Sequence, residues 1–274
     1  MLYAVKDWDN AYANGPNIAG GERWPGLWAG PAETYRSEMK GQGRARLDIA
    51  YGGHDRQRLD LFLPEGKPKG LVVFVHGGYW MRLDKSFWSH LARGPIARGH
   101  AVAMPSYRLC PEVGIADISA DVAQAIARAM DEVDGPVALT GHSAGGHLVS
   151  RMICRGAPLS VERQARIESV VSISGLHDLR PLQRTAMNDT LHIDDAIAAS
   201  ESPALLVPVD GVGVTAWVGG AERNEFRRQA QLLANIWTGL VASTAYVEAP
   251  DRHHFDVIDE LADAESALVK ALVD

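Results

Sequence analysis

Short apolar runs alternate along the chain with longer stretches in which apolar residues recur at helical spacing. The apolar runs predict strands at 44–51, 58–63, 70–75, 101–104, 136–140, 169–174, 215–218 and 243–247. The helical spacing predicts helices at about 85–98, 116–133, 147–153, 224–237 and 257–273. Strands that alternate with helices are joined by right-handed crossovers, so we expect a mostly parallel central sheet with helices on both faces.

Two segments depart from this alternation. Residues 1–44 are rich in Gly, Pro, Trp and Tyr, and we expect them to form an irregular arm with short helical pieces packed over the main domain. Residues 177–208 contain no long periodic run and are a candidate lid or cap insertion. No internal repeat or linker-like stretch divides the 274 residues, so we expect a single α/β domain over 1–274.

Composition excludes several classes of function. The net charge is −7 and Lys and Arg form no run, so nucleic acid is not an expected partner. No apolar stretch reaches transmembrane length and residues 1–8 do not resemble a signal peptide, so we expect no membrane association. Cys110 and Cys154 lie far apart and indicate no disulfide framework, which favours a cytoplasmic protein. The sequence allows a homo-oligomer but does not predict one.

The most informative motif is Gly141-His142-Ser143-Ala144-Gly145, which reads Gly-x-Ser-x-Gly. A predicted strand precedes it and a predicted helix follows it. A serine on such a sharp strand-to-helix turn is exposed in a strained backbone conformation, and the flanking glycines remove side chains that would clash there. This context predicts the nucleophile elbow of an α/β-hydrolase, with Ser143 as the nucleophile.

A serine nucleophile needs a base within hydrogen-bond reach. In α/β-hydrolases the acid and then the histidine follow the serine along the chain. His147 lies too close behind Ser143 to reach it, whereas His253 and His254 follow the last predicted strand. We favour His254 as the base, with His253 as the alternative.

The base in turn needs an orienting acid. Glu222 follows the strand at 215–218, at the sheet edge where open α/β sheets build their ligand sites. Asp178 follows the preceding strand, but it reads equally well as a helix cap or turn residue. Glu225 fits a charge in the first turn of the next helix. We favour Glu222 as the acid, with Asp178 as the alternative.

The segment His76-Gly77-Gly78-Tyr79-Trp80 directly follows the strand at 70–75. Acyl transfer passes through a tetrahedral oxyanion, which needs donors aimed at it in advance. We expect the N–H groups of Gly78, Tyr79 and Ala144 to form this oxyanion hole. Tyr79 and Trp80 are also candidates for stacking on an aromatic substrate, although aromatic residues often serve only core packing.

No metal-ligand spacing, phosphate loop or dinucleotide fingerprint stands out, so we expect neither a metal nor a cofactor.

Together these segments resemble the kynurenine formamidase (arylformamidase) group of the α/β-hydrolase superfamily. The resemblance spans roughly residues 45–265. Besides the motifs above, it is carried by the segments 107–111, 174–182, 225–229 and 253–255. The Gly-Tyr-Trp form of the oxyanion loop separates this group from lipase-like esterases, which prefer a third glycine. Glu222 stands where the group tends to have Asp, and a glutamate can also orient an imidazole.

The resemblance implies a serine hydrolase that needs no cofactor. Its substrate would be a small molecule, N-formylkynurenine, which would be cleaved to kynurenine and formate by Ser143, His254 and Glu222. The alternative is a carboxylesterase or another small-acyl amidase, because the same machinery serves all of these substrates.

Overall fold

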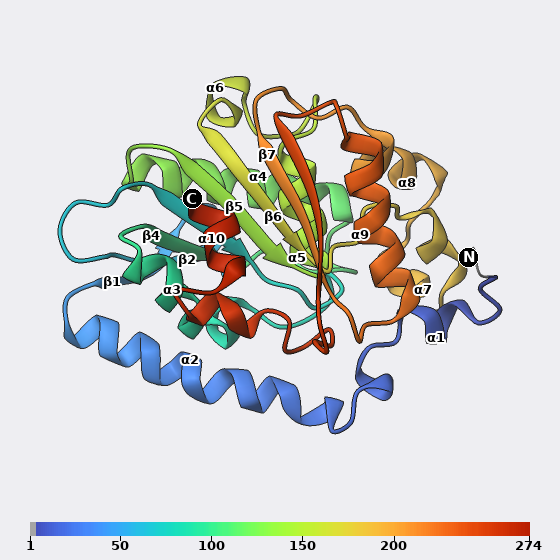
Figure 1. Cartoon of the computed structure of the whole chain (residues 1–274), viewed down its shortest axis with the longest axis horizontal. Helices are drawn as coiled ribbons and strands as arrows, with labels where there is room; N and C mark the ends of the chain where they lie inside the picture. Colours follow the sequence, from blue (N-terminus) through green and yellow to red (C-terminus); the bar gives the residue numbers. More distant parts are fainter. Residues whose placement is uncertain (1–3) are drawn as a thin grey trace.

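The computed structural model describes residues 4–274, so the first three residues of the predicted arm lie outside it. Its centre is a sheet of eight strands in the order β1-β2-β4-β3-β5-β6-β7-β8 (Figure 1). The strands are β1 (Ala45–Ala50), β2 (Arg58–Phe62), β3 (Leu71–Val75), β4 (Ala101–Pro105), β5 (Val137–His142), β6 (Ile167–Ile173), β7 (Gly213–Gly219) and β8 (Ser243–Ala249). β2 pairs antiparallel with both of its neighbours, and β3 to β8 pair in parallel. All eight strands were expected from the apolar runs.

Alternate residues of the central strands enter two separate cores, one on each face of the sheet. The α-helices are α1 (Trp8–Tyr12), α2 (Trp24–Gly41), α3 (Arg93–Ala97), α4 (Ile115–Glu132), α5 (Ala144–Met152), α6 (Val161–Gln164), α7 (Asn188–Leu191), α8 (Asp195–Glu201), α9 (Asn224–Trp237) and α10 (Ala267–Val273). Val73 and Val75 of β3 pack with α4, α5 and α9, whereas Val72 and Phe74 pack with α2, α3 and α10. The expectation of an α/β-hydrolase sheet covered on both faces is therefore confirmed.

Short 3-10 helices interrupt the longer elements. They are η1 (Gly15–Asn17), η2 (Gly21–Arg23), η3 (Lys85–Phe87), η4 (Ser89–Ala92), η5 (Arg180–Arg184), η6 (Pro203–Leu205) and η7 (Asp259–Ala262). The single helix expected over 85–98 is consequently three pieces, η3, η4 and α3, and the one expected over 257–273 is η7 and α10. In the second case Ser266 caps α10 by accepting the N–H of Val269, which separates the two pieces.

The arm contains more regular structure than the sequence indicates. The 18-residue helix α2 occupies residues 24–41 and packs along η3 and η4 on the lower side of the molecule in Figure 1. Pro31 lies inside this helix, and its glycines are poor helix formers, which explains why the pattern did not predict it. Trp28, Tyr35 and Met39 form its buried face.

The parallel arrangement fixes where the loops after β3, β5, β6, β7 and β8 lie. Carboxyl ends of parallel strands meet at one edge of a sheet, where ligand sites of open α/β sheets are built. Each loop that carries a predicted site residue therefore reaches the same edge. Within residues 4–274, no helix combines the length and the apolar character needed to cross a membrane.

Candidate active site

Ser143 occupies the sharp turn between β5 and α5. Its backbone has φ 56° and ψ −118°, a conformation that side-chain-bearing residues rarely adopt. A Cβ atom at Gly145 would lie 1.9 Å from the carbonyl oxygen of Val75, and one at Gly141 would lie 2.3 Å from the carbonyl oxygen of Gly145. Only glycine fits at either position, which explains why the turn needs both glycines of the motif.

His254 and Glu222 meet at this edge of the sheet. The Nδ1 atom of His254 lies 2.7 Å from Oε2 of Glu222, and both side chains are buried. Two backbone hydrogen bonds join the loops that carry them, from Gly220 N–H to Ala249 O at 2.7 Å and from Ala221 N–H to Arg252 O at 2.9 Å. The two loops therefore hold the imidazole and the carboxylate together.

The second oxygen of Glu222 has two donors of its own. It accepts hydrogen bonds from the Ser174 hydroxyl and, at 2.8 Å, from the Gly219 N–H. Ser174 follows the last residue of β6 and was not singled out from the sequence, where it is only a polar residue at the end of a strand. With both of its oxygens occupied, the buried carboxylate is fixed in a single orientation.

The imidazole of His254 packs among other rings. The ring centres of Phe226 and His142 lie 4.4 and 4.6 Å from that of His254. His142 donates a hydrogen bond from Nε2 to the backbone oxygen of His254 at 2.8 Å. Burial, and then the proximity of His254, hold the pKa of His142 well below its usual range, so His142 remains neutral.

The alternative triad residues are engaged elsewhere. Both carboxylate oxygens of Asp178 pair with the Arg180 guanidinium at 2.9 Å. His253 accepts the N–H of Phe255 at Nδ1 and packs edge-on against Trp24, with ring centres 5.1 Å apart. Neither residue takes part in the contact between His254 and Glu222.

The loop after β3 adopts a tight left-handed turn. Gly78, Tyr79 and Trp80 have φ values of 115°, 54° and 59°. A Cβ atom at Gly78 would lie 2.2 Å from the carbonyl oxygen of Arg82, so glycine is required there. Among residues 4–274, the N–H groups of Gly78, Tyr79 and Ala144 have no hydrogen-bond acceptor. These three donors are therefore free to bind a ligand atom.

The two aromatic residues of this loop lie in different environments. The Tyr79 hydroxyl donates to the backbone oxygen of Tyr12 at 2.6 Å and accepts from Asn14 Nδ2 at 2.8 Å. Burial raises its pKa to about 12, so the hydroxyl keeps its proton. Trp80 is fully buried and packs edge-on against His147, away from the residues that line the cavity. The expectation that Trp80 stacks on a substrate is therefore corrected, because the left-handed turn directs its ring into the core.

A cavity of about 890 Å³ opens beside Ser143 and His254. Its walls also include Gly78 and Tyr79 of the loop and Trp88 and Phe255. Much of the remaining lining comes from the arm, namely Asp9, Tyr12, Ala13, Asn14, Gly15, Pro16, Gly21, Glu22, Pro25 and Trp28. The candidate lid at 177–208 contributes only Ala186 and Met187. In this structure the arm is thus the main cover of the site, whereas the sequence predicted more generally that it packs over the main domain.

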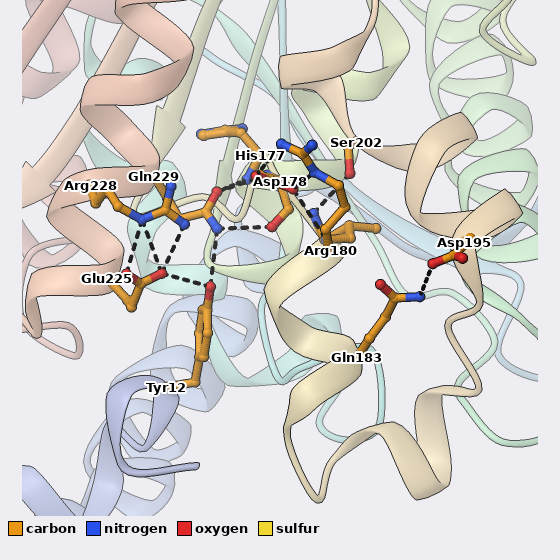
Figure 2. Close-up of polar contacts among 11 residues, drawn as sticks. Tyr12, His177, Asp178, Arg180, Gln183, Asp195, Ser202, Glu225, Arg228 and Gln229 are labelled. Atoms are coloured by element: carbon orange, nitrogen blue, oxygen red, sulfur yellow. Dashed lines mark hydrogen bonds and ion pairs between the residues drawn. The ribbon is translucent and has the colours of Figure 1, made fainter. Parts of the chain in front are cut away.

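A polar network fastens the arm to α9 (Figure 2). The Tyr12 hydroxyl donates to Glu225 at 2.9 Å and accepts from Gln229 at 3.2 Å. Arg228 pairs with the same glutamate, and the Gln229 side-chain oxygen accepts the backbone N–H groups of residues 177 and 178 at 2.8 Å. This network explains the Glu-Phe-x-Arg-Gln stretch at 225–229, because its polar residues join the arm, α9 and the loop after β6.

The arrangement suits nucleophilic acyl transfer. It combines a serine on a strained turn, a histidine held by a buried carboxylate and free N–H donors around one cavity. Among the described residues, no group of three or more His, Cys, Asp or Glu side chains is placed to hold a metal ion.

Comparisons with known proteins find similarity to hydrolases. The BD-FAE family model matches residues 59–206. The chain is 25% identical to a kynurenine formamidase of Danio rerio, over 83% of this chain and 80% of that protein. It is 27% identical to a kynurenine formamidase of Drosophila melanogaster, over 85% of this chain and 78% of that protein.

Two solved structures extend the comparison. The chain superposes on a candidate thioesterase from a Silicibacter species with a TM-score of 0.92 and 50% identity, covering 98% of this chain and 99% of that one. It superposes on an esterase of Pyrobaculum calidifontis with a TM-score of 0.65 and 19% identity, covering 90% of each chain. The second likeness is one of fold alone.

Proposed function

Because the chain belongs to the BD-FAE family, whose model matches more than half of it, and is a serine hydrolase of the α/β-hydrolase type, we propose that it cleaves the formamide bond of N-formyl arylamines. The substrate is N-formylkynurenine, which yields kynurenine and formate. The observation that carries the proposal is the 2.7 Å contact between His254 and Glu222 beside the cavity that Ser143 lines. The formamide substrate is supported by the similarity to kynurenine formamidases over most of the chain.

The reaction begins when the Ser143 hydroxyl attacks the formyl carbon and His254 takes its proton. Glu222 occupies Nδ1 of the imidazole, so the proton is received at Nε2. The negative charge on the formyl oxygen is stabilised by the N–H groups of Gly78, Tyr79 and Ala144.

The tetrahedral intermediate then collapses. The bond between carbon and nitrogen breaks, and His254 returns its proton to the leaving aniline nitrogen. A water molecule, deprotonated by His254, attacks the formyl ester on Ser143 and releases formate. This sequence restores the serine hydroxyl and the neutral imidazole, and it requires no redox step or cofactor.

The cavity is compatible with this substrate. Its volume of about 890 Å³ falls within the range of small-molecule sites, roughly 300–1,000 Å³. Trp28, Trp88 and Phe255 give it aromatic walls, against which an arylamine ring can pack.

A second candidate substrate class is a small-acyl thioester or ester. It is favoured by the 50% identity to a candidate thioesterase over nearly the whole chain. The same serine, histidine and oxyanion donors would attack a thioester carbonyl, and a thiolate leaves without the protonation that an aniline needs. The reaction class is therefore shared, and the leaving group distinguishes the two proposals.

The test compares kcat/KM for N-formylkynurenine, a short acyl thioester and a 4-nitrophenyl ester of the same acyl length. The Ser143→Ala variant provides the background for each substrate. The formamidase proposal expects N-formylkynurenine to be the best substrate. A higher kcat/KM for the thioester, together with formamide turnover no faster than in Ser143→Ala, would overturn it in favour of the second candidate.

A further inference from the structure

One strongly basic residue, Arg82, lines the cavity. Among the described residues that line the cavity, it is the only Lys or Arg, and it is exposed. Within residues 4–274 its guanidinium has neither an ion pair nor a side-chain hydrogen bond. An unpaired guanidinium keeps all of its donors available, in a planar arrangement that matches a carboxylate.

The oxyanion loop fixes the position of Arg82. The backbone N–H of Arg82 donates to the Gly78 oxygen at 3.2 Å, so Arg82 lies one turn beyond the predicted oxyanion donors. Its guanidinium carbon lies 5.8 Å from the centre of the Tyr79 ring. The Tyr79 ring is itself held by the arm through its hydroxyl. The cation therefore lies over a fixed aromatic ring beside the site, and its N–H donors remain available for a ligand.

The acidic residues of the cavity do not neutralise Arg82. The two lining carboxylates, Asp9 and Glu22, both belong to the arm. Asp9 accepts the backbone N–H of Ala186 at 2.6 Å, and neither carboxylate pairs with Arg82. The cavity thus has an aromatic interior, a cation beside the oxyanion loop and carboxylates on the arm. A zwitterionic head group on an aromatic body matches this distribution of charge.

We propose that Arg82 is a specificity-determining residue that binds the carboxylate of the substrate, so that the enzyme selects acyl compounds that bear a carboxylate over those that lack one. The inference rests on the proposed function for the identity of the substrate, because N-formylkynurenine carries an α-carboxylate and an α-ammonium group beyond its aryl ring. Arg82 pairs with the carboxylate, and the carboxylates of the arm face the ammonium group.

The test uses N-formylkynurenine and its decarboxylated analogue N-formylkynuramine, which differ only in the carboxylate. The measured quantity is the ratio of their kcat/KM values. A hydrogen-bonded charge pair contributes about 1.5–3 kcal/mol, so Arg82→Gln should lower this ratio about 10- to 100-fold. Arg82→Lys should lower it less, because the charge remains while the bidentate geometry is lost.

Arg93→Gln is the matched control. The Arg93 guanidinium also lies over a tyrosine ring, 5.4 Å from the centre of Tyr35, but Arg93 does not line the cavity. This variant should keep the wild-type ratio. The proposal is overturned if Arg82→Gln leaves the ratio unchanged, or if Arg93→Gln lowers it equally.

A second substrate pair separates this proposal from the proposed function. If the wild-type enzyme cleaves no formamide, the same variants are compared on two esters. The 4-nitrophenyl monoester of glutarate keeps a free carboxylate and is anionic, whereas 4-nitrophenyl butyrate is neutral. A preference for the glutarate ester that is lost only in Arg82→Gln supports carboxylate binding even when the formamidase proposal has failed. The absence of such a preference in the wild type, with ester turnover intact, refutes it.

Discussion

Replacement of Glu222 by glutamine tests the orientation of the base without changing the size of the side chain. One carboxylate oxygen accepts hydrogen bonds from the Ser174 hydroxyl and the Gly219 N–H. The backbone N–H can only donate, so in Glu222→Gln the amide oxygen must stay at this position. The amide NH₂ group then faces Nδ1 of His254, where the Glu222 carboxylate lies at 2.7 Å in the wild type.

This exchange reverses the hydrogen bond to the imidazole. Nδ1 must accept from the amide, so the proton of the neutral ring moves to Nε2, the atom that should receive the serine proton. A wrong tautomer in a serine–histidine–acid triad costs on the order of 10⁴ in kcat, which corresponds to about 5 kcal/mol of transition-state free energy.

The assay measures kcat on a 4-nitrophenyl ester, with the enzyme concentration taken from its ultraviolet absorbance. Glu248→Gln serves as the matched control, because Glu248 pairs with Arg227 and does not line the cavity. Thermal unfolding verifies that both variants fold. A Glu222→Gln enzyme that retains more than about one-tenth of the wild-type kcat would contradict the proposed orienting role of Glu222, because a misoriented base cannot sustain that rate.

Three further predictions concern the framework of the site. Tyr12→Phe removes the buried hydroxyl that donates to Glu225 at 2.9 Å, so the free energy of unfolding should fall by about 1–3 kcal/mol. An unchanged melting temperature would contradict the described role of the network. Gly145→Ala places a Cβ atom 1.9 Å from the Val75 oxygen, so the free energy of unfolding measured by urea titration should fall by at least about 2 kcal/mol. An unaltered midpoint would show that the turn tolerates a side chain. Burial lowers the pKa values of His76 and His147 from 6.5 to about 4, so the unfolded chain binds these protons first as the pH falls. The free energy of unfolding should therefore decrease from pH 6.5 towards pH 4 by up to about 1.4 kcal/mol per pH unit for each histidine. Equal free energies of unfolding at pH 7 and pH 5 would contradict this expectation.

The strands could be predicted from the sequence because most of them are buried on both faces. Continuous apolar runs such as residues 71–75 have no other stable location than the middle of a covered sheet. The helices were harder to delimit, because their ends depend on local capping. Ser266, for example, begins a new helix inside what the apolar spacing presented as one element.

The proposed catalytic residues could be selected from motifs, whereas the residues that support them could not. Ser143, Glu222 and His254 each follow a strand at the expected end of the sheet. Ser174 supports the acid through a contact across 48 residues of sequence, and nothing in its local pattern indicates that partner. Contacts of this kind depend on tertiary packing, which the pattern of one strand does not determine.

The contacts by which the arm covers the cavity could not be predicted, for a similar reason. Its Gly- and Pro-rich composition is typical of irregular surface structure. Only the folded chain brings Tyr12 next to Glu225, 213 residues away, and seats Asn14 on the Tyr79 hydroxyl. Trp80 shows the opposite case, since its position in the oxyanion loop suggested a binding residue and the backbone turn buries it.

Nucleophilic catalysis by Ser143 is tested by an acid-quenched single turnover of N-formylkynurenine, followed by mass spectrometry of the peptide that contains Ser143. The proposed reaction predicts a transient mass increase of one formyl group on Ser143, which forms as kynurenine appears and decays as formate is released. Ser143→Ala should show neither the adduct nor the burst of kynurenine. Kynurenine released without an adduct, at an equal rate in Ser143→Ala, would contradict nucleophilic catalysis by this serine.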